Sequence, residues 1–454
     1  MSGMEYKTAI IGMGKTGQSA ARFLMCRGIE CEAFDESFVS LPNDLDIVLH
    51  AGVLNADVLK GFDRLIVSPG IHYNHPALVA VRQAGIAVIG DLELFAEAYQ
   101  GDLIAITGTN GKTTTVSLIS TMLDILPGGI EAGGNIGMPM LELLGDGDEL
   151  HADPPRVVLE LSSFQLERAQ AIKPQWAALL NVQPDHADMH ADMQSYEDAK
   201  LRLFAKQGAG DKAMLPADAR WHALADALRK RGVYVRRFGI GETDKIDAGV
   251  QMQADGSWQV FWHHYDQAQV VSSDELPAQG VHQHLNLAVA AQAAADFGIA
   301  ASVIRQSLTS FRGLPHRLQS LGLVAGREWF NDSKATNPDA ARAALESFHQ
   351  VVWICGGLRK GIDVSVLRET VTDHVEQVFV IGADAKPFTD LAAAAGVPCS
   401  FVKTVEQAVK QAVHAVAGVP VLLSPAAASQ DQFKDYIERG NAFAASISAL
   451  EADI

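Results

Sequence analysis

The segment from Ile104 to Thr115 reads IAITGTNGKTTT and constrains the fold more than any other stretch of the chain. A short apolar run ends at a glycine turn, and residues with helical apolar spacing follow: Val116, Leu118, Ile119, Met122 and Leu123. A strand, a glycine loop and then a helix that opens with Lys-Thr is a pattern that predicts a nucleotide-phosphate site. In such a site backbone N–H groups face the phosphate oxygens, and the lysine neutralises their charge. The loop is shorter than the Walker spacing, since Ile106 occupies the first glycine position.

Size and charge narrow the class of protein. The 454 residues, 48% of them hydrophobic, suffice for about three domains at roughly 150 residues each. No apolar run approaches the roughly 20 residues of a membrane-spanning helix. The formal charge of −18 disfavours nonspecific binding to nucleic acid or anionic membranes. We therefore expect a monomer whose partners are small molecules, with no nucleic acid and no membrane.

Cysteine usage and the first residues bear on the compartment. The four cysteines, Cys26, Cys31, Cys355 and Cys399, lack the spacing of metal ligands and indicate reduced thiols. The opening MSGMEYKTAIIGMG leads directly into a predicted strand and lacks a secretory signal pattern. Both features favour a cytoplasmic location.

Strands and helices alternate along the chain and divide it into three predicted domains, 1–94, 95–313 and 314–454. We expect an α/β fold with mostly parallel sheets: a Rossmann-like N-terminal domain, a central P-loop ATPase-like domain and a Rossmann-like C-terminal domain. Residues 247–271 alternate around Asp255-Gly256 and predict an antiparallel hairpin. Predicted strands include 7–11, 32–34, 46–49, 64–67, 156–161, 176–182, 351–355, 377–381, 400–402 and 420–424, and predicted alanine-rich helices span 285–297 and 301–311.

The turn from Gly12 to Gly17 resembles the glycine turn of Rossmann-type units. It follows the first predicted strand, and the acid Asp35 ends the second, about 20 residues further on. A ligand with a pyrophosphate and a ribose suits such a turn and acid. NAD is one such ligand, and a nucleotide sugar is another.

Polar residues just past the central strands predict a second part of the site, because open α/β sheets bind ligands at the carboxyl ends of their strands. Glu160 interrupts an apolar run, and a carboxylate there is costly to bury unless it meets a cation or a donor. Asp185 and His186 follow the next strand, and Asn135 lies in a Gly-Asn turn. The phosphate loop favours Mg²⁺ as the cation, since Mg²⁺ prefers oxygen ligands.

Eight stretches, in order, resemble one family over essentially the whole chain. They are GTNGKTT at 108–114, GGNIGMP at 133–139, LELSSFQLE at 159–167, NVQPDHAD at 181–188, YEDAKLRLF at 196–204, GLPHR at 313–317, NDSKATNP at 331–338 and LLSPAAASQDQFKDYIERG at 422–440. The chain is thereby identified as similar to the Mur ligases, the cytoplasmic ligases of bacterial peptidoglycan synthesis, and within them to the branch that adds D-glutamate.

The resemblance implies an ADP-forming amide ligase. ATP would phosphorylate the terminal carboxylate of UDP-N-acetylmuramoyl-L-alanine, and the amine of D-glutamate would attack the resulting acyl phosphate. Such chemistry needs cations around two reacting anions, exclusion of water and donors for an oxyanion.

The resemblance also implies roles for individual residues. The catalytic set is Lys112, Glu160, His186 and Lys200. ATP would be bound by Gly108, Thr109, Asn110, Gly111, Lys112, Thr113 and Thr114, with Asn286, Arg317 and Asp332. Two Mg²⁺ ions would be held by Thr113, Glu160, His186 and Lys200, the last as a carbamate formed with CO₂. The UDP-sugar substrate would be bound by Thr16, Asp35, Gly70, Asn135 and His186, and D-glutamate by Lys334, Thr336, Lys360, Ser429 and Tyr436.

Three residues depart from the family pattern, and three other functions stay open. Gln283 stands where many relatives have Asn, and Gln430 and Tyr436 stand where relatives often have Leu and Phe. The alternatives are a ligase for a different amino acid, a nucleotide-dependent oxidoreductase built on the first domain, and a noncatalytic nucleotide sensor. A simple dehydrogenase does not need the phosphate loop, and a sensor does not need a second metal site.

Overall fold

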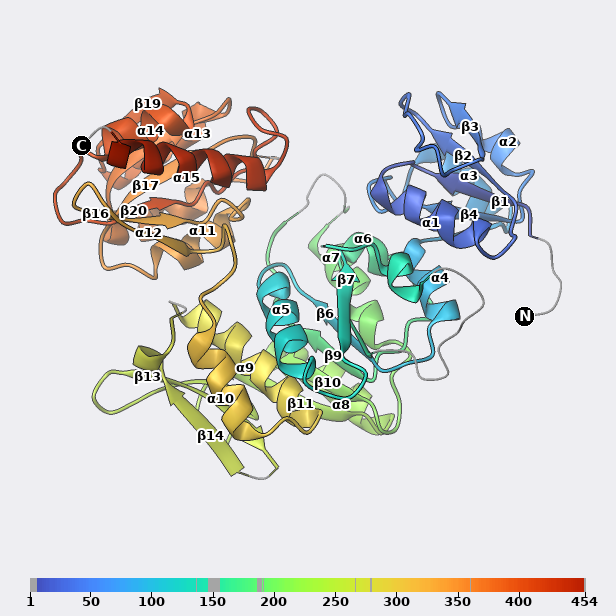
Figure 1. Ribbon diagram of the computed structural model, residues 1–454, viewed down its shortest axis with the longest axis horizontal. Helices are drawn as coiled ribbons and strands as arrows, with labels where there is room; N and C mark the ends of the chain where they lie inside the picture. The colour runs from blue at the N-terminus through green and yellow to red at the C-terminus, as the bar shows by residue number, and fades with distance from the viewer. Residues whose placement is uncertain are drawn as a thin grey trace.

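The chain forms three α/β bodies, each built on its own sheet (Figure 1). The computed structural model describes residues 6–135, 137–145, 156–185, 190, 192–265, 267–277, 280–359 and 361–452. The N-terminal sheet, in blue, and the C-terminal sheet, in red, lie on opposite sides above the central sheet.

The N-terminal sheet has five parallel strands in the order β3-β2-β1-β4-β5. Its strands are β1 (Thr8–Ile11), β2 (Cys31–Asp35), β3 (Val48–Ala51), β4 (Arg64–Val67) and β5 (Ala87–Ile89), and its helices are α1 (Lys15–Met25), α2 (Ala56–Leu59) and α3 (Pro76–Gln83). Helix α4 (Asp91–Ala98) then leads into the central sheet. The predicted domain boundary between 94 and 95 falls inside α4, and the domain limits stay a prediction.

The central sheet has nine strands in the order β14-β13-β12-β11-β10-β9-β6-β8-β7. The strands are β6 (Leu103–Thr107), β7 (Ile130–Gly134), β8 (Arg156–Glu160), β9 (Trp176–Leu179), β10 (Lys212–Pro216), β11 (Tyr234–Ile240), β12 (Ala248–Met252), β13 (Trp258–His264) and β14 (Gln267–Ser272). The helices are α5 (Lys112–Leu123), α6 (Ser163–Leu166), α7 (Met193–Leu201), α8 (His222–Lys230), α9 (Val281–Asp296) and α10 (Ala301–Ser310), with 3₁₀ turns at Met140–Leu144, Arg202–Phe204, Ala219–Trp221 and Ser273–Glu275. Only β12, β13 and β14 pair in antiparallel fashion within this sheet as described.

The C-terminal sheet has six strands in the order β15-β16-β20-β17-β18-β19. The strands are β15 (Gln319–Val324), β16 (Arg327–Asn331), β17 (Val351–Gly356), β18 (Val375–Ile381), β19 (Cys399–Lys403) and β20 (Val421–Leu423). The helices are α11 (Pro338–Leu345), α12 (Arg368–His374), α13 (Ala385–Ala395), α14 (Val405–Ala412) and α15 (Tyr436–Ala452), with a 3₁₀ turn at Ser365–Leu367. The hairpin β15–β16 is antiparallel and the other pairings are parallel.

The predicted α/β class with mostly parallel sheets is confirmed, and so is the hairpin around Asp255-Gly256. Strand β11, which was not predicted, carries the consecutive arginines Arg236 and Arg237. Arg236 is accommodated because it donates to Asp247, 11 residues away in the sequence, and to Asp296, 60 residues away. A local sequence pattern does not show the contact with Asp296.

The core of the central domain places the phosphate loop. The apolar face of α5 packs with the alanine-rich face of α9, where residues 287–291 are fully buried. Small side chains let the two helices approach closely. In the part of the chain that the structure describes, no helix is both long and apolar enough to cross a membrane.

Gly17 is required by a close backbone approach, which gives a stability prediction. A Cβ at Gly17 would lie 2.0 Å from the carbonyl oxygen of Gly12, whereas a Cβ at Gly14 would meet nothing within 4 Å. Forcing backbone apart in a packed region costs about 1–3 kcal/mol or more. We expect Gly17→Ala to lower the Tm in calorimetry by several degrees, while Gly14→Ala leaves it nearly unchanged. Equal effects of the two substitutions would contradict this packing argument.

Candidate active site

The phosphate loop between β6 and α5 has backbone conformations that favour glycine. Gly108 has φ +155° and Gly111 has φ +86°, and a Cβ on Gly111 would lie 2.2 Å from the side-chain oxygen of Asn286. Asn181 lies just after the end of β9, and its side chain holds the loop in place. Its Oδ1 accepts the N–H groups of Thr109 at 3.1 Å and Asn110 at 2.9 Å. The loop is therefore preorganised by contacts outside its own sequence.

Lys112 folds back over the loop. Its Nζ donates to the carbonyl oxygens of Gly108 and Thr109, both at 2.8 Å. Burial lowers the pKa of Lys112, while the attraction of Glu160 opposes that change. Carbonyl dipoles are weaker partners for an ammonium group than phosphate oxygens are, so the position suits a polyphosphate.

Glu160 ends β8 and is only 2% exposed. Its Oε2 accepts the Thr113 hydroxyl at 2.8 Å, and its Oε1 accepts the Asn135 amide at 3.1 Å. Burial acts to raise its pKa, but the charges of Lys112 and Arg317, together with the hydrogen bonds from Asn135 and Thr113, bring the pKa below its usual value. A buried ionised carboxylate beside a hydroxyl offers the hard oxygen ligands that Mg²⁺ prefers.

Lys200, on α7, contacts the same loop. It is 1% exposed, its Nζ donates to Gly108 O at 2.9 Å, and the ammonium lies 4.4 Å from the centre of the Tyr196 ring. Burial and the nearby charge of Lys112 bring the pKa of Lys200 well below its usual value. The environment thus favours a neutral, nucleophilic amine.

The C-terminal domain covers the phosphate loop. Arg317 donates to the Thr113 hydroxyl, and the Asn337 amide donates to Asp185 Oδ2 at 3.2 Å. Asn337 also caps α11, since its Oδ1 accepts the N–H of Ala340. Two separate polar contacts therefore link the central and C-terminal domains at the site.

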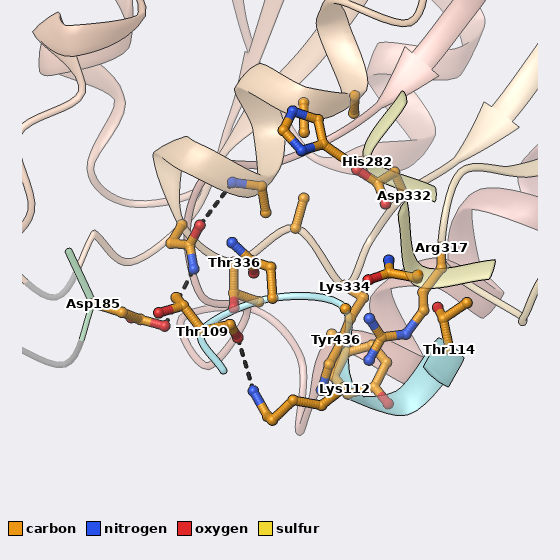
Figure 2. Close-up of a pocket in the computed structure, with 18 of the residues that line it drawn as sticks. Thr109, Lys112, Thr114, Asp185, His282, Arg317, Asp332, Lys334, Thr336 and Tyr436 are labelled. Carbon is orange, nitrogen blue, oxygen red and sulfur yellow. Dashed lines mark hydrogen bonds between the residues drawn. The ribbon is translucent and has the colours of Figure 1, made fainter. Parts of the chain in front are cut away.

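A cavity of about 370 Å³ lies at this junction (Figure 2). In Figure 2 the side chains of Arg317, Lys334 and Tyr436 gather beside Lys112. The predicted residues that line the cavity are Thr109, Asn110, Gly111, Lys112, Thr114, Asn135, Glu160, Lys200, Asn286, Arg317, Asp332, Lys334, Thr336, Ser429 and Tyr436.

Two polar groups in the cavity wall are suited to a ligand. Asp332 is buried, and its carboxylate accepts the Leu318 N–H at 3.1 Å and the Ser424 hydroxyl at 2.9 Å. The Ser429 hydroxyl is buried and has no hydrogen-bond partner among the described residues. Lys334 Nζ lies 3.9 Å from the centre of the Tyr436 ring, beside these groups.

Three predicted residues, Thr16, Asp35 and Gly70, belong to the N-terminal domain and do not line this cavity. Asp35 organises the glycine turn, because its Oδ2 accepts the Met13 N–H at 2.7 Å. The Ser68 hydroxyl, from the loop after β4, donates to Gly12 O at 2.6 Å. The two N-terminal loops thus form one unit.

Two predicted residues, His186 and Lys360, lie outside the described residues. Among the residues that the structure describes, no group of three or more His, Cys, Asp or Glu side chains could hold a metal ion.

Sequence reasoning missed several residues of the site. Asn181 and Tyr196 hold the phosphate loop, and His282 and Asn337 line the cavity. A signal existed for Tyr196, which stands four residues before Lys200 on the same helix face. The contact between Asn337 and Asp185 spans 152 residues and has no local signature.

Fold and site together define a three-domain protein with a nucleotide-phosphate loop facing a lysine-lined and arginine-lined cavity. Family models match residues 6–90 (Mur ligase MurD-like, N-terminal domain), 106–294 (Mur ligase middle domain) and 316–427 (Mur ligase, glutamate ligase domain). The chain belongs to the Mur ligase family.

This chain is similar to individual curated proteins over nearly its full length. It is 36% identical to a UDP-N-acetylmuramoylalanine–D-glutamate ligase of Nitrosococcus oceani, covering 96% of this chain and 95% of that one. It is 37% identical to the protein of the same name from Methylococcus capsulatus, covering 98% and 95%. The UDP-N-acetylmuramate-alanine ligase of Thermotoga maritima shares the fold with a TM-score of 0.59 and 17% identity, covering 98% and 99%.

Asp332 gives a testable pH dependence. Burial raises its pKa to about 7, although the Ser424 hydroxyl and the Leu318 N–H act to lower it. Between the unfolded pKa near 4 and this value, the folded state keeps a proton that the unfolded state has lost, so stability falls as pH rises through that window.

Asp332→Asn removes this titration. We measure the Tm of both proteins without nucleotide and subtract the value of Asp332→Asn from that of the wild type. We expect this difference in Tm to decrease as the pH rises from about 4 to about 8. A difference that stays constant across this range would show that Asp332 keeps an ordinary pKa.

Proposed function

We propose that this chain joins D-glutamate to UDP-N-acetylmuramoyl-L-alanine in an ATP-dependent, ADP-forming reaction of peptidoglycan precursor synthesis. The observation that carries the proposal is the convergence of Lys112, Glu160 and Lys200 on one phosphate loop, opposite Arg317 and Lys334. The names of relatives that are 36% and 37% identical over nearly the whole chain support the choice of substrates.

ATP occupies the loop Gly108–Thr114 with its phosphates on the N-terminus of α5. Lys112 turns from the loop carbonyls to the β- and γ-phosphates, and Arg317 moves from Thr113 to a phosphate oxygen. Asn286 contacts the adenine and Asp332 the ribose. Lys112 and Arg317 would exchange hydrogen bonds to neutral loop groups for stronger ones to phosphate oxygens, which supports placing ATP on this loop.

Two Mg²⁺ sites are part of the proposal. Thr113 and Glu160 would hold one ion, and the 2.8 Å between their oxygens fits a shared cation. His186 and the modified Lys200 would hold the other. Bound Mg²⁺ screens the repulsion between two reacting anions.

Lys200 becomes an oxygen ligand by reacting with CO₂. The Nζ lone pair forms an N–C bond, one C=O electron pair moves onto oxygen, and Nζ passes a proton to solvent water. The step needs a neutral amine, and burial of Lys200 favours one. The product is a carbamate anion, which also relieves the repulsion from Lys112.

The acyl phosphate and D-glutamate meet at the cavity wall that the C-terminal domain forms. We assign residues 314–454 to this domain. Lys334, Thr336, Lys360, Ser429 and Tyr436 bind D-glutamate. Two substrate carboxylates require positive groups and donors, and the buried Ser429 hydroxyl without a protein partner supports such a contact. Closure of this domain over residues 95–313 keeps water from the acyl phosphate.

The UDP-sugar substrate spans two domains. Thr16, Asp35 and Gly70, within the N-terminal domain 1–94, bind the uridine diphosphate, and Asn135 and His186 bind the sugar end near Glu160. The N-terminus of α1 at Lys15 and the turn held by Asp35 support an anion there.

Phosphate release tests the proposal directly. We expect the protein to release phosphate from ATP with Mg²⁺, UDP-N-acetylmuramoyl-L-alanine and D-glutamate, and to discriminate against L-glutamate and D-alanine. Ser429→Ala should raise the KM for D-glutamate about tenfold, as expected for one lost hydrogen bond to a charged group, with little change for ATP. Lys112→Ala is the inactive control. Equal kcat/KM for both glutamate enantiomers would refute the amino-acid assignment.

The carbamate has its own test. We expect Lys200→Ala to be nearly inactive and to regain part of its activity with formate or acetate, which can supply oxygen atoms in the space left by the side chain. Lys112→Ala serves as the matched control, because a carboxylate cannot replace its positive charge. Rescue of both variants, or of neither, would count against a carbamate on Lys200.

A further inference from the structure

Arg168 bridges the N-terminal and central domains, and no role proposed above accounts for it. It follows α6 in the central domain, is 4% exposed, and donates to the carbonyl oxygens of Ile71 and Phe164. Ile71 belongs to the N-terminal domain, 97 residues earlier in the chain. A buried arginine is costly unless its guanidinium is hydrogen-bonded or paired, because its charge must be desolvated.

The contacts of Arg168 continue into both halves of the proposed substrate site. On one side, Ile71 N donates to Ser68 O at 3.1 Å, and the Ser68 hydroxyl donates to Gly12 O at 2.6 Å. These are the two loops assigned to the diphosphate. On the other side, Phe164 and the neighbouring Ser162 and Ser163 line the active-site cavity just after Glu160.

Neighbouring residues pack against the Arg168 side chain. Its Cζ lies 5.7 Å from the centre of the Tyr73 ring. A Cβ added to Gly90, just before α4, would lie 3.6 Å from the Arg168 Cβ. Asp91 is buried nearby, and burial raises its pKa to about 6 against the effects of Gln165 and Arg168. In Figure 1, α4 and α6 lie together at the base of the N-terminal domain.

We propose that Arg168 is a positioning residue that sets the spacing between the diphosphate half-site and the sugar–carboxylate half-site. This inference rests on the proposed function, since it concerns a substrate that spans both domains. A ligand with two linked ends binds tightly only when both half-sites are held at the matching distance, because the second contact is then intramolecular. Uridine diphosphate alone uses one half-site and does not sense the spacing.

The test compares the whole substrate with its nucleotide end. The variants are Arg168→Met, which keeps much of the side-chain volume, and Arg168→Lys, which keeps the charge but not the forked donors. The control is Arg327→Met. Arg327 is 6% exposed and donates to three carbonyl groups, Ala415, Val416 and Val419, all within the C-terminal domain.

We expect both Arg168 variants to raise the KM for UDP-N-acetylmuramoyl-L-alanine about tenfold or more, the size of effect that a lost linkage of two half-sites produces. The Kd for uridine diphosphate in calorimetry and the KM for ATP should change by less than about twofold. Arg327→Met should lower the Tm without changing either substrate constant.

Other outcomes overturn the inference. An equal loss of affinity for uridine diphosphate would mean that Arg168 only maintains the fold of the N-terminal loops, and an unchanged KM would mean that it has no role in binding. If Arg168→Met does not fold, Arg168→Lys alone decides between these results. Wild-type protein that does not turn over the UDP-sugar would instead refute the proposed function.

Discussion

A buried carboxylate held ionised by two cations is the interaction on which the site depends. Glu160 is buried at the end of an apolar strand, and burial acts to raise the pKa of its carboxyl group. Lys112 and Arg317 supply the compensating charge, and Thr113 and Asn135 donate to its two oxygens. Because Arg317 comes from beyond the central domain, the electrostatics of the phosphate loop are coupled to the placement of the C-terminal domain.

The same cluster explains why the loop is ready for an anion. Lys112 and Arg317 are partly buried beside Glu160, and among the described residues the ammonium of Lys112 donates only to carbonyl oxygens of the loop. Lys112 and Lys200 both donate to Gly108 O, so one carbonyl oxygen serves two amines. A polyphosphate would give Lys112 and Arg317 oxygen partners of their own, and this gain favours nucleotide binding.

Sequence patterns predicted the parts of the fold that local periodicity controls. The strand 64–67, the hairpin around Asp255-Gly256 and the loop at 108–114 all appear as expected. Glu160 was also predicted as a site residue, because a charged residue at the end of an apolar strand is visible locally. Strand β11 was missed because the charge of Arg236 within it is compensated by Asp296, 60 residues away in the sequence.

The glycine pattern of the first domain illustrates a limit of motif reasoning. Gly12, Gly14 and Gly17 satisfy the three-glycine spacing of dinucleotide sites, so the turn by itself does not separate NAD from a nucleotide sugar. The Asp35 carboxylate accepts the Met13 N–H, which shows that this acid shapes the turn itself.

Contacts between domains were beyond the reach of sequence reasoning. The Asn337 amide meets Asp185, and Arg168 meets Ile71, across 152 and 97 residues. Neither contact follows from propensity or spacing, since each depends on how two finished domains pack. The proposed reaction, with substrates on three domains, would need such contacts, because reacting groups must be held within a fraction of an ångström while no single domain contains them all. The residues that set this geometry are therefore buried polar groups at domain junctions, and in this chain Arg168 and Asn337 are the clearest examples among the described residues.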